Sequence, residues 1–143
     1  MKQDDTFQLF VYGSLRSGFY SPAYNYVSKY FTLVGDAKVK GILYDMGDYP
    51  VGVATANARF IVGELYQIKH KEAFDFAIAQ LDDYEGLNGE DNEVVLYERS
   101  VAEITVNETT TTAWTYWYKG DTTNKPIVIS GDVLQYFKEK NNL

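Results

Sequence analysis

Glu85 is the residue of this chain whose type and position best fit proton-transfer chemistry. Residues 71–84 carry apolar side chains at i, i+3, i+4 and i+7, a pattern typical of a helix with one buried face: Phe74, Ala77, Ile78 and Leu81. At about 100° per residue, Glu85 falls one turn beyond Leu81, at the end of that face, whereas Asp82 and Asp83 turn towards solvent. Partial burial and the negative end of the helix dipole both raise the pKa of such a carboxyl towards neutrality, as an acid/base catalyst requires. The alternative is a frayed terminal glutamate that bends out to water.

A second candidate feature is the loop that follows the first predicted strand, Phe7 to Val11. This loop, Gly13 to Gly18, is rich in glycine and serine. A strand that leads directly into such a loop leaves backbone N–H groups without ladder partners, and these can surround an anion or a developing oxyanion. The alternative is a plain strand-to-loop turn. The loop lacks the Gly-Lys-Ser/Thr of a P-loop, so we do not expect a nucleotide.

Other side chains offer less chemistry. Ser14 has no triad partner, because the single histidine, His70, stands between two lysines at a predicted helix start. One histidine and no cysteine exclude a histidine-based metal site, a thiolate nucleophile and disulfides. The acidic run Asp82 to Glu93 lacks the ligand spacing and central glycine of a calcium loop. We therefore expect neither a metal nor a cofactor.

Composition indicates one globular domain over residues 1–143, with 45% hydrophobic and 16% aromatic residues. The net charge of −7 argues against nucleic-acid or anionic-membrane partners, which need a basic face. Acidic residues stand at the N-terminus where a signal peptide would be apolar, and no run approaches the ~20 apolar residues that span a bilayer. We expect a cytoplasmic protein, a monomer or weak homodimer, that binds a small molecule.

Short strands and a few helices must position these features. Strands are predicted at Phe7 to Val11, Lys38 to Tyr44, Val51 to Ala54, Arg59 to Ile68, Val94 to Val106 with a break near Arg99-Ser100, Thr111 to Tyr118, and Ile127 to Ile129. Besides the helix at 71–84, a short one begins at Ser21-Pro22 and ends before or at Gly35, and a helical turn covers Asp132 to Lys138. On the strand Thr111 to Tyr118, one face carries the aromatic residues Trp114, Tyr116 and Tyr118. The set predicts an α+β fold built on a β-barrel-like sheet.

Six short motifs occur in an order and spacing that are specific as a set. They are Val11-Tyr12-Gly13-Ser14-Leu15; Gly41-Ile42-Leu43-Tyr44 followed by Asp48-Tyr49-Pro50; Val62-Gly63-Glu64-Leu65-Tyr66; Leu81-Asp82-Asp83-Tyr84-Glu85-Gly86; Ala113-Trp114-Thr115-Tyr116; and Ser130-Gly131-Asp132. In this order they resemble the γ-glutamylcyclotransferase-like superfamily, the AIG2-like proteins, over nearly the whole chain. The resemblance implies a small mixed β-barrel with flanking helices.

It also implies an activity, the cyclisation of a γ-glutamyl group to 5-oxoproline with release of a free amine. By resemblance, Glu85 is the catalytic acid/base, the main chain of Tyr12, Gly13, Ser14 and Leu15 holds the glutamyl moiety, and Tyr116 helps to close the pocket. No metal or cofactor is implied, because the nucleophile is tethered to the carbonyl that it attacks.

The loop lacks the Asn that often follows Ser in relatives acting on γ-glutamyl amino acids. Together with Leu81-Asp82-Asp83-Tyr84-Glu85, this loop looks closer to that of the γ-glutamylamine cyclotransferases, whose substrates include γ-glutamyl-ε-lysine. Val133 stands where many bacterial relatives carry Trp, which affects the packing of the tail rather than the chemistry. Two alternatives stay open: a non-catalytic protein that binds an amino-acid-like ligand on the same fold, and a tailoring enzyme that removes a γ-glutamyl protecting group.

Overall fold

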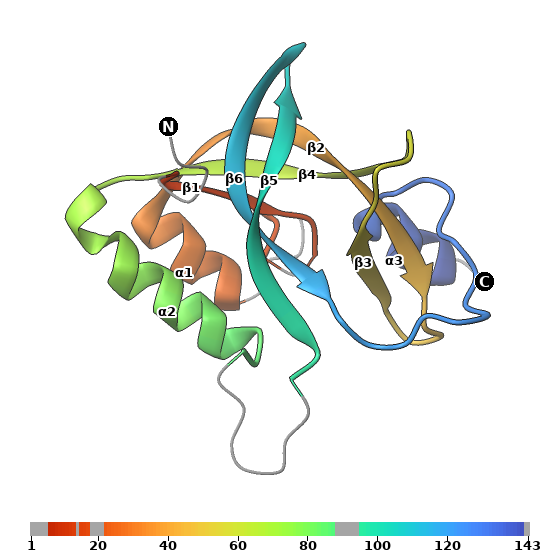
Figure 1. Ribbon diagram of the computed structural model, residues 1–143. Helices are drawn as coiled ribbons and strands as arrows, with labels where there is room; N and C mark the ends of the chain where they lie inside the picture. The colour runs from red at the N-terminus through yellow and green to blue at the C-terminus, as the bar shows by residue number, and fades with distance from the viewer. Residues whose placement is uncertain (1–5, 14, 18–21, 88–94, 142–143) are drawn as a thin grey trace.

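A closed β-barrel forms the centre of the molecule (Figure 1). The structure is a computed structural model and describes residues 6–13, 15–17, 22–87 and 95–141. Within these ranges the strands are β1 (Gln8–Val11), β2 (Phe31–Asp45), β3 (Pro50–Ala54), β4 (Phe60–Ile68), β5 (Tyr97–Val106) and β6 (Thr109–Tyr118). The sheet order is β3-β2-β4-β1-β6-β5, and β5 pairs back with β2, which closes five of these described strands into a ring and leaves β3 on the edge of β2.

The barrel is mixed because β1 runs parallel to β6, while the other pairs are antiparallel. Closure rests on two register pairs, Lys38 with Thr105 and Val39 with Ile104. The predicted α+β fold with a small mixed barrel and flanking helices is therefore confirmed. β1 brings the loop that follows it to the middle of the sheet, between β4 and β6.

The described helices flank the barrel: α1 (Pro22–Tyr30), the 3₁₀ turn η3 (Lys71–Ala73) with α2 (Phe74–Tyr84), and α3 (Val133–Asn141). Figure 1 shows α1 and α2 side by side against one side of the barrel and α3 beyond β3. The predicted apolar face of α2 is buried, as are Ala23 and Val27 of α1. α2 ends at Tyr84, and Gly86 follows it two residues later with a φ of +80°, which suits the predicted glycine that terminates the helix.

Side chains on opposite faces of the central strands pack into two cores. Leu9 and Val11 of β1 join the core between the barrel and helices α1 and α2, whereas Phe10 joins the core inside the barrel. β6 divides in the same way, with Tyr116 in the first core and Trp117 in the second. The predicted separation of faces on this strand is confirmed, and the central strands are apolar on both sides.

Four local predictions were wrong. Gly35 does not follow α1 but lies within β2, where a register irregularity between Leu33 and Gly35 accommodates it. β5 is unbroken at Arg99 and Ser100, because both residues pair with β6. The hairpin turn is only Asn107-Glu108, both with positive φ, so β6 begins at Thr109. Residues 127–129 form a single bridge from Ile127 to Tyr44 rather than a strand.

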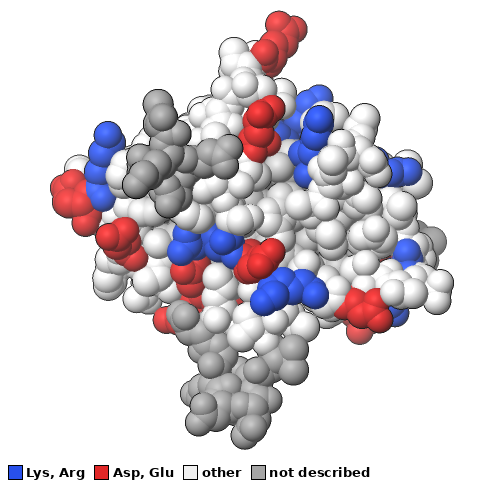
Figure 2. All heavy atoms as spheres, in the orientation of Figure 1, with Lys and Arg blue, Asp and Glu red and all other residues white. Residues whose placement is uncertain are grey.

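Charges of both signs are interspersed on the face in Figure 2, and the described residues there form no continuous basic surface of the kind that nucleic-acid binding uses. The exclusion of nucleic-acid partners nevertheless stays a prediction from net charge. Among the described residues, no helix has the length and apolar character needed to cross a membrane.

Candidate active site

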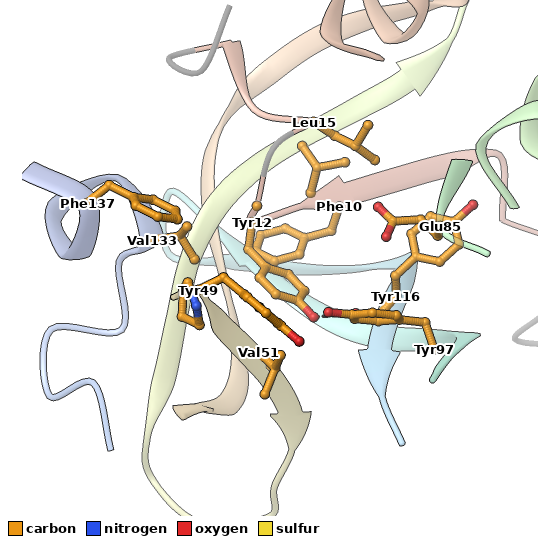
Figure 3. Close-up of a pocket in the computed structure, with 14 residues that line it drawn as sticks. Phe10, Tyr12, Leu15, Tyr49, Val51, Glu85, Tyr97, Tyr116, Val133 and Phe137 are labelled. Carbon is orange, nitrogen blue, oxygen red and sulfur yellow. Dashed lines mark hydrogen bonds between the residues drawn. The ribbon is translucent and has the colours of Figure 1, made fainter. Parts of the chain in front are cut away.

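A cavity of about 210 Å³ opens where the loop after β1, strand β3, the end of α2 and helix α3 meet (Figure 3). Most of its described lining is apolar or aromatic, and the full set is Phe10, Val11, Tyr12, Gly13, Leu15, Tyr49, Pro50, Val51, Gly52, Glu85, Tyr97, Tyr116, Val133 and Phe137. A few polar groups in a concave apolar site are typical of small-molecule pockets.

Glu85 is the carboxyl group in this lining. It follows α2 directly, and its backbone N–H donates to the carbonyl oxygen of Leu81 at 2.9 Å, which fixes the residue to the last turn. Its carboxyl points into the cavity in Figure 3. Burial, and secondarily the charge of Asp82, raise the pKa of Glu85 to about 7. A carboxyl with a pKa near neutrality can both accept and return a proton at physiological pH.

Asp82 differs from its prediction, because it does not turn to solvent. Its carboxylate accepts two hydrogen bonds from Arg99, Nε to Oδ1 at 2.8 Å and Nη2 to Oδ2 at 3.0 Å. The Tyr116 hydroxyl also donates to Oδ1 at 2.7 Å. Arg99 and Tyr116 are register partners across β5 and β6, so both reach the same point of α2. Helix periodicity did not indicate this, because the partners come from another part of the chain.

Two tyrosines are fixed by their hydroxyl groups. The Tyr116 hydroxyl donates its hydrogen bond to Asp82, and the ring of Tyr116 lines the cavity. The Tyr12 hydroxyl donates to the carbonyl oxygen of Tyr116 at 2.5 Å. Burial, followed by Tyr97 and Glu85, raises the pKa of Tyr12 well above its ordinary value. Tyr12 is therefore a neutral phenol that ties the end of β1 to β6.

Tyr12 also lies very close to β3. A Cβ atom at Gly52 would fall 2.6 Å from the Tyr12 hydroxyl oxygen and 2.7 Å from two of its ring carbons. On its other side the Tyr12 ring faces Trp117, with centroids 6.0 Å apart. Glycine at 52 is thus required for the close approach of β3 to the tyrosine that lines the cavity.

The loop after β1 is held by a buried carboxylate of β4. Glu64 accepts hydrogen bonds from the Ser17 N–H at 2.8 Å and the Ser17 hydroxyl at 2.6 Å, and from the Tyr66 hydroxyl at 3.0 Å. Arg16 is buried as well, and its guanidinium contacts Asp132 at 3.0 Å. These contacts fix the far end of the loop, so that its beginning faces the cavity.

The structure brings most of the predicted site residues to one place. Tyr12, Gly13, Leu15, Glu85 and Tyr116 all line the cavity, and their chemical roles stay predictions. Ser14 lies outside the described residues. The side chain of His70 is 75% exposed, with Glu72 4.0 Å from its Nδ1, which fits its predicted solvation.

The sequence reasoning missed several walls of the cavity. Tyr49 belongs to a motif that was noted only for the resemblance, and Val133 and Phe137 stand at i and i+4 on α3, a spacing that could have indicated one shared face. No local signal marks Tyr97, because its neighbours in space, Tyr118 of β6, Tyr49 and Glu85, are distant from it along the chain. The ion pair of Asp82 with Arg99 was also missed.

Comparison with known proteins adds a family and a fold. The sequence model of the family described as "Gamma-glutamyl cyclotransferase, AIG2-like" matches residues 9–135. YkqA from Bacillus subtilis shares 20% identity with a TM-score of 0.68, over 95% of this chain and 42% of YkqA. The uncharacterized protein PH0828 from Pyrococcus horikoshii shares 19% identity with a TM-score of 0.63, over 96% of this chain and 98% of its own.

A third similar structure is the K. lactis urea amidolyase, at 15% identity and a TM-score of 0.64, where 98% of this chain matches 8% of that one. At these identities the likeness shows a shared fold, and the chain spans less than half of the length of YkqA. No curated protein matches the sequence.

Proposed function

Because this chain belongs to the gamma-glutamyl cyclotransferase, AIG2-like family, we propose that it cyclises a γ-glutamyl group to 5-oxoproline and releases the attached amine. One observation carries the proposal: Glu85 lines the same cavity as Tyr12, Gly13 and Leu15 of the loop after β1. The proton-transfer group and the loop whose backbone N–H groups we propose as donors thus share a single small pocket.

In this mechanism the carboxylate of Glu85 takes one proton from the substrate's α-ammonium. The freed amine attacks the γ-carbonyl carbon of the same glutamyl group, and a C–N bond forms that closes the five-membered ring. Glu85 then gives its proton to the nitrogen of the departing amine as the original C–N bond breaks. The attacking nitrogen loses a second proton to solvent, and the free amine takes one up from solvent, so that charges and atoms balance.

The loop supplies the electrostatic part of the proposal. Main-chain N–H groups of Gly13 and Leu15, with Ser14 between them, bind the glutamyl carboxylate or the carbonyl oxygen that becomes negative during attack. Tyr116 closes the pocket with its ring, because its hydroxyl is bonded to Asp82. We include in the proposal that the leaving group is an amine rather than an amino acid.

The test is release of 5-oxoproline by wild type and Glu85→Gln from a panel of γ-glutamyl amines and γ-glutamyl amino acids. The amide keeps the shape of the side chain but cannot exchange a proton, so we expect kcat to fall by roughly 10²–10⁴ while circular dichroism is unchanged. A Gln variant that fails to fold would favour a structural role for Glu85. Binding of a substrate by calorimetry without release by wild type would favour the non-catalytic binding protein.

A further inference from the structure

We propose that Glu64, a buried residue of β4 outside the cavity lining, is a positioning residue that holds the loop after β1 in the conformation that binds the glutamyl group. The inference rests on the proposed function, in which this loop binds the substrate. It gives a role to the motif Val62-Gly63-Glu64-Leu65-Tyr66, which the proposed reaction does not use.

Glu64 is a charged residue in the middle of the sheet. It lies on β4, between β2 and β1, and only 6% of it is exposed. A carboxylate buried there is strongly unfavourable unless hydrogen bonds replace its hydration. The Ser17 N–H at 2.8 Å and the Tyr66 hydroxyl at 3.0 Å donate to Oε1, and the Ser17 hydroxyl donates to Oε2 at 2.6 Å. Two of these three donors belong to the loop, so the carboxylate and the loop fix each other's position.

The position of Ser17 determines how the beginning of the loop faces the cavity. Leu15, two residues earlier, lines the cavity, and the Arg16 N–H donates to the carbonyl oxygen of Gly13 at 3.0 Å, which closes a turn. The N–H groups of Arg16 and Ser17 are therefore occupied, and the backbone donors for a ligand must come from residues 13–15. Because the turn leads directly into Ser17, the contact with Glu64 sets the direction of these donors.

A second attachment of the loop leads back to the same strand. The Arg16 guanidinium contacts the Asp132 carboxylate at 3.0 Å, and the Arg16 side chain is only 8% exposed. Directly before Asp132, the carbonyl oxygen of Gly131 accepts a hydrogen bond from the N–H of Val62 at 2.8 Å. β4 thus holds the loop by two routes, directly through Glu64 and indirectly through Val62 and the turn before α3. The direct route is the one that a single side chain controls.

The two hydroxyl groups that donate to Glu64 give a matched pair of variants. Ser17→Ala removes the donor on the loop, and Tyr66→Phe removes the donor on β4. With the γ-glutamyl substrate that wild type uses best, we expect Ser17→Ala to raise KM by about threefold to tenfold, with kcat and its pH dependence retained because Glu85 is untouched. Tyr66→Phe should keep KM within about twofold of wild type, since this hydroxyl does not contact the loop. An equal rise of KM in both variants, or a loss confined to kcat, would overturn the inference.

A double-mutant cycle tests whether Glu64 acts through Ser17. Glu64→Gln keeps the size of the side chain but offers one acceptor oxygen to three donors, so KM should rise at least as much as in Ser17→Ala. In the double variant KM should rise by less than the product of the two single effects, because both changes disturb the same contact. A rise equal to that product would overturn the inference.

The outcomes separate this inference from the proposed function. Circular dichroism checks that each variant is folded, and the comparison of Ser17→Ala with Tyr66→Phe decides the question if Glu64→Gln does not fold. Release of 5-oxoproline by wild type with an unchanged KM in Ser17→Ala would overturn the role of Glu64 alone. Absence of 5-oxoproline from every substrate with wild type would overturn the proposed function and, with it, this inference.

Discussion

Glu85 is surrounded by groups that oppose its ionisation. Burial has the largest effect, and the Asp82 carboxylate adds to it. Asp82 itself is held by Arg99 and Tyr116, so its charge stays at a fixed place beside the catalytic candidate. Burial therefore accounts for most of the rise in the pKa of Glu85, and Asp82, which touches no substrate in our proposal, adds to it.

This arrangement predicts the pH profile. Glu85 must be ionised to accept the α-ammonium proton, so kcat/KM should rise as pH increases through about 7. In Asp82→Asn one negative charge is lost, the pKa of Glu85 falls, and the rise should move to lower pH. The measurement is the pH dependence of 5-oxoproline release, with Asp75→Asn on the exposed first turn of α2 as a control. A profile that moves equally in both variants would contradict the local role of Asp82.

The same shift predicts an effect on stability. The folded-state pKa of about 7 exceeds the ordinary 4.5, so Glu85 contributes stability below pH 4.5 that is lost as pH rises through 7. Glu85→Gln has no such titration. The free energy of unfolding of Glu85→Gln minus that of wild type should therefore be more positive at pH 8 than at pH 4, by about 1–3 kcal/mol. Urea unfolding of both proteins at the two pH values measures this, and a difference that does not change with pH would contradict it.

At the scale of elements, the contact between Tyr12, directly after β1, and strand β3 depends on one glycine. Gly52→Ala would push a methyl group into the Tyr12 ring and hydroxyl, so we expect a loss of about 1–3 kcal/mol in the free energy of unfolding. Gly13→Ala is the control for stability, because nothing lies within 4 Å of its added methyl group. Chemical denaturation of both variants makes the comparison. An equal loss in the free energy of unfolding in Gly52→Ala and Gly13→Ala would contradict the inference that the close approach of Tyr12 requires a glycine at position 52.

Local patterns predicted the elements that carry their own signal. The four-residue apolar face of α2 and Gly86 were sufficient to place the helix and its end, and with them Glu85. They could not place Asp82, because its environment is set by Arg99 and Tyr116, which the barrel brings to it. Likewise β5 was predicted to break at Arg99-Ser100, since a polar pair reads as a turn when the partner strand is not visible.

The cavity as a whole could not be predicted from the sequence either, because its walls come from distant parts of the chain. Its walls come from β1, β3, β5, β6, the end of α2 and α3, and only the arrangement of the barrel decides which of their side chains meet. Tyr97 and Phe137 are ordinary aromatic residues in the sequence. The composition of the chain already marked the loop after β1, whereas the role of Tyr116 came from the resemblance, because a family's motifs reflect its fold and spacing along the chain does not.

At the scale of the molecule, the two cores share their strands. β1, β4 and β6 each contribute side chains to both cores, so neither core can form without the other. Trp114 packs against the first core and Trp117 lies in the second, which gives a probe for each. In Trp114→Phe and in Trp117→Phe, the midpoint of the remaining tryptophan's fluorescence in urea should equal that of far-UV circular dichroism. Separate midpoints in either variant would show that the cores unfold independently.

The span of the cavity along the chain also determines when it can exist. A ribosome adds roughly 5–20 residues per second, so on the order of ten seconds separate the synthesis of Phe10 from that of Phe137, which line the same pocket. During most of this time β1, which is apolar on both faces, has no β6 to pair with, because its parallel neighbour has not yet been synthesised. A growing chain therefore has the glycine loop before it has a pocket, and the pocket cannot be complete until Phe137 has left the ribosome.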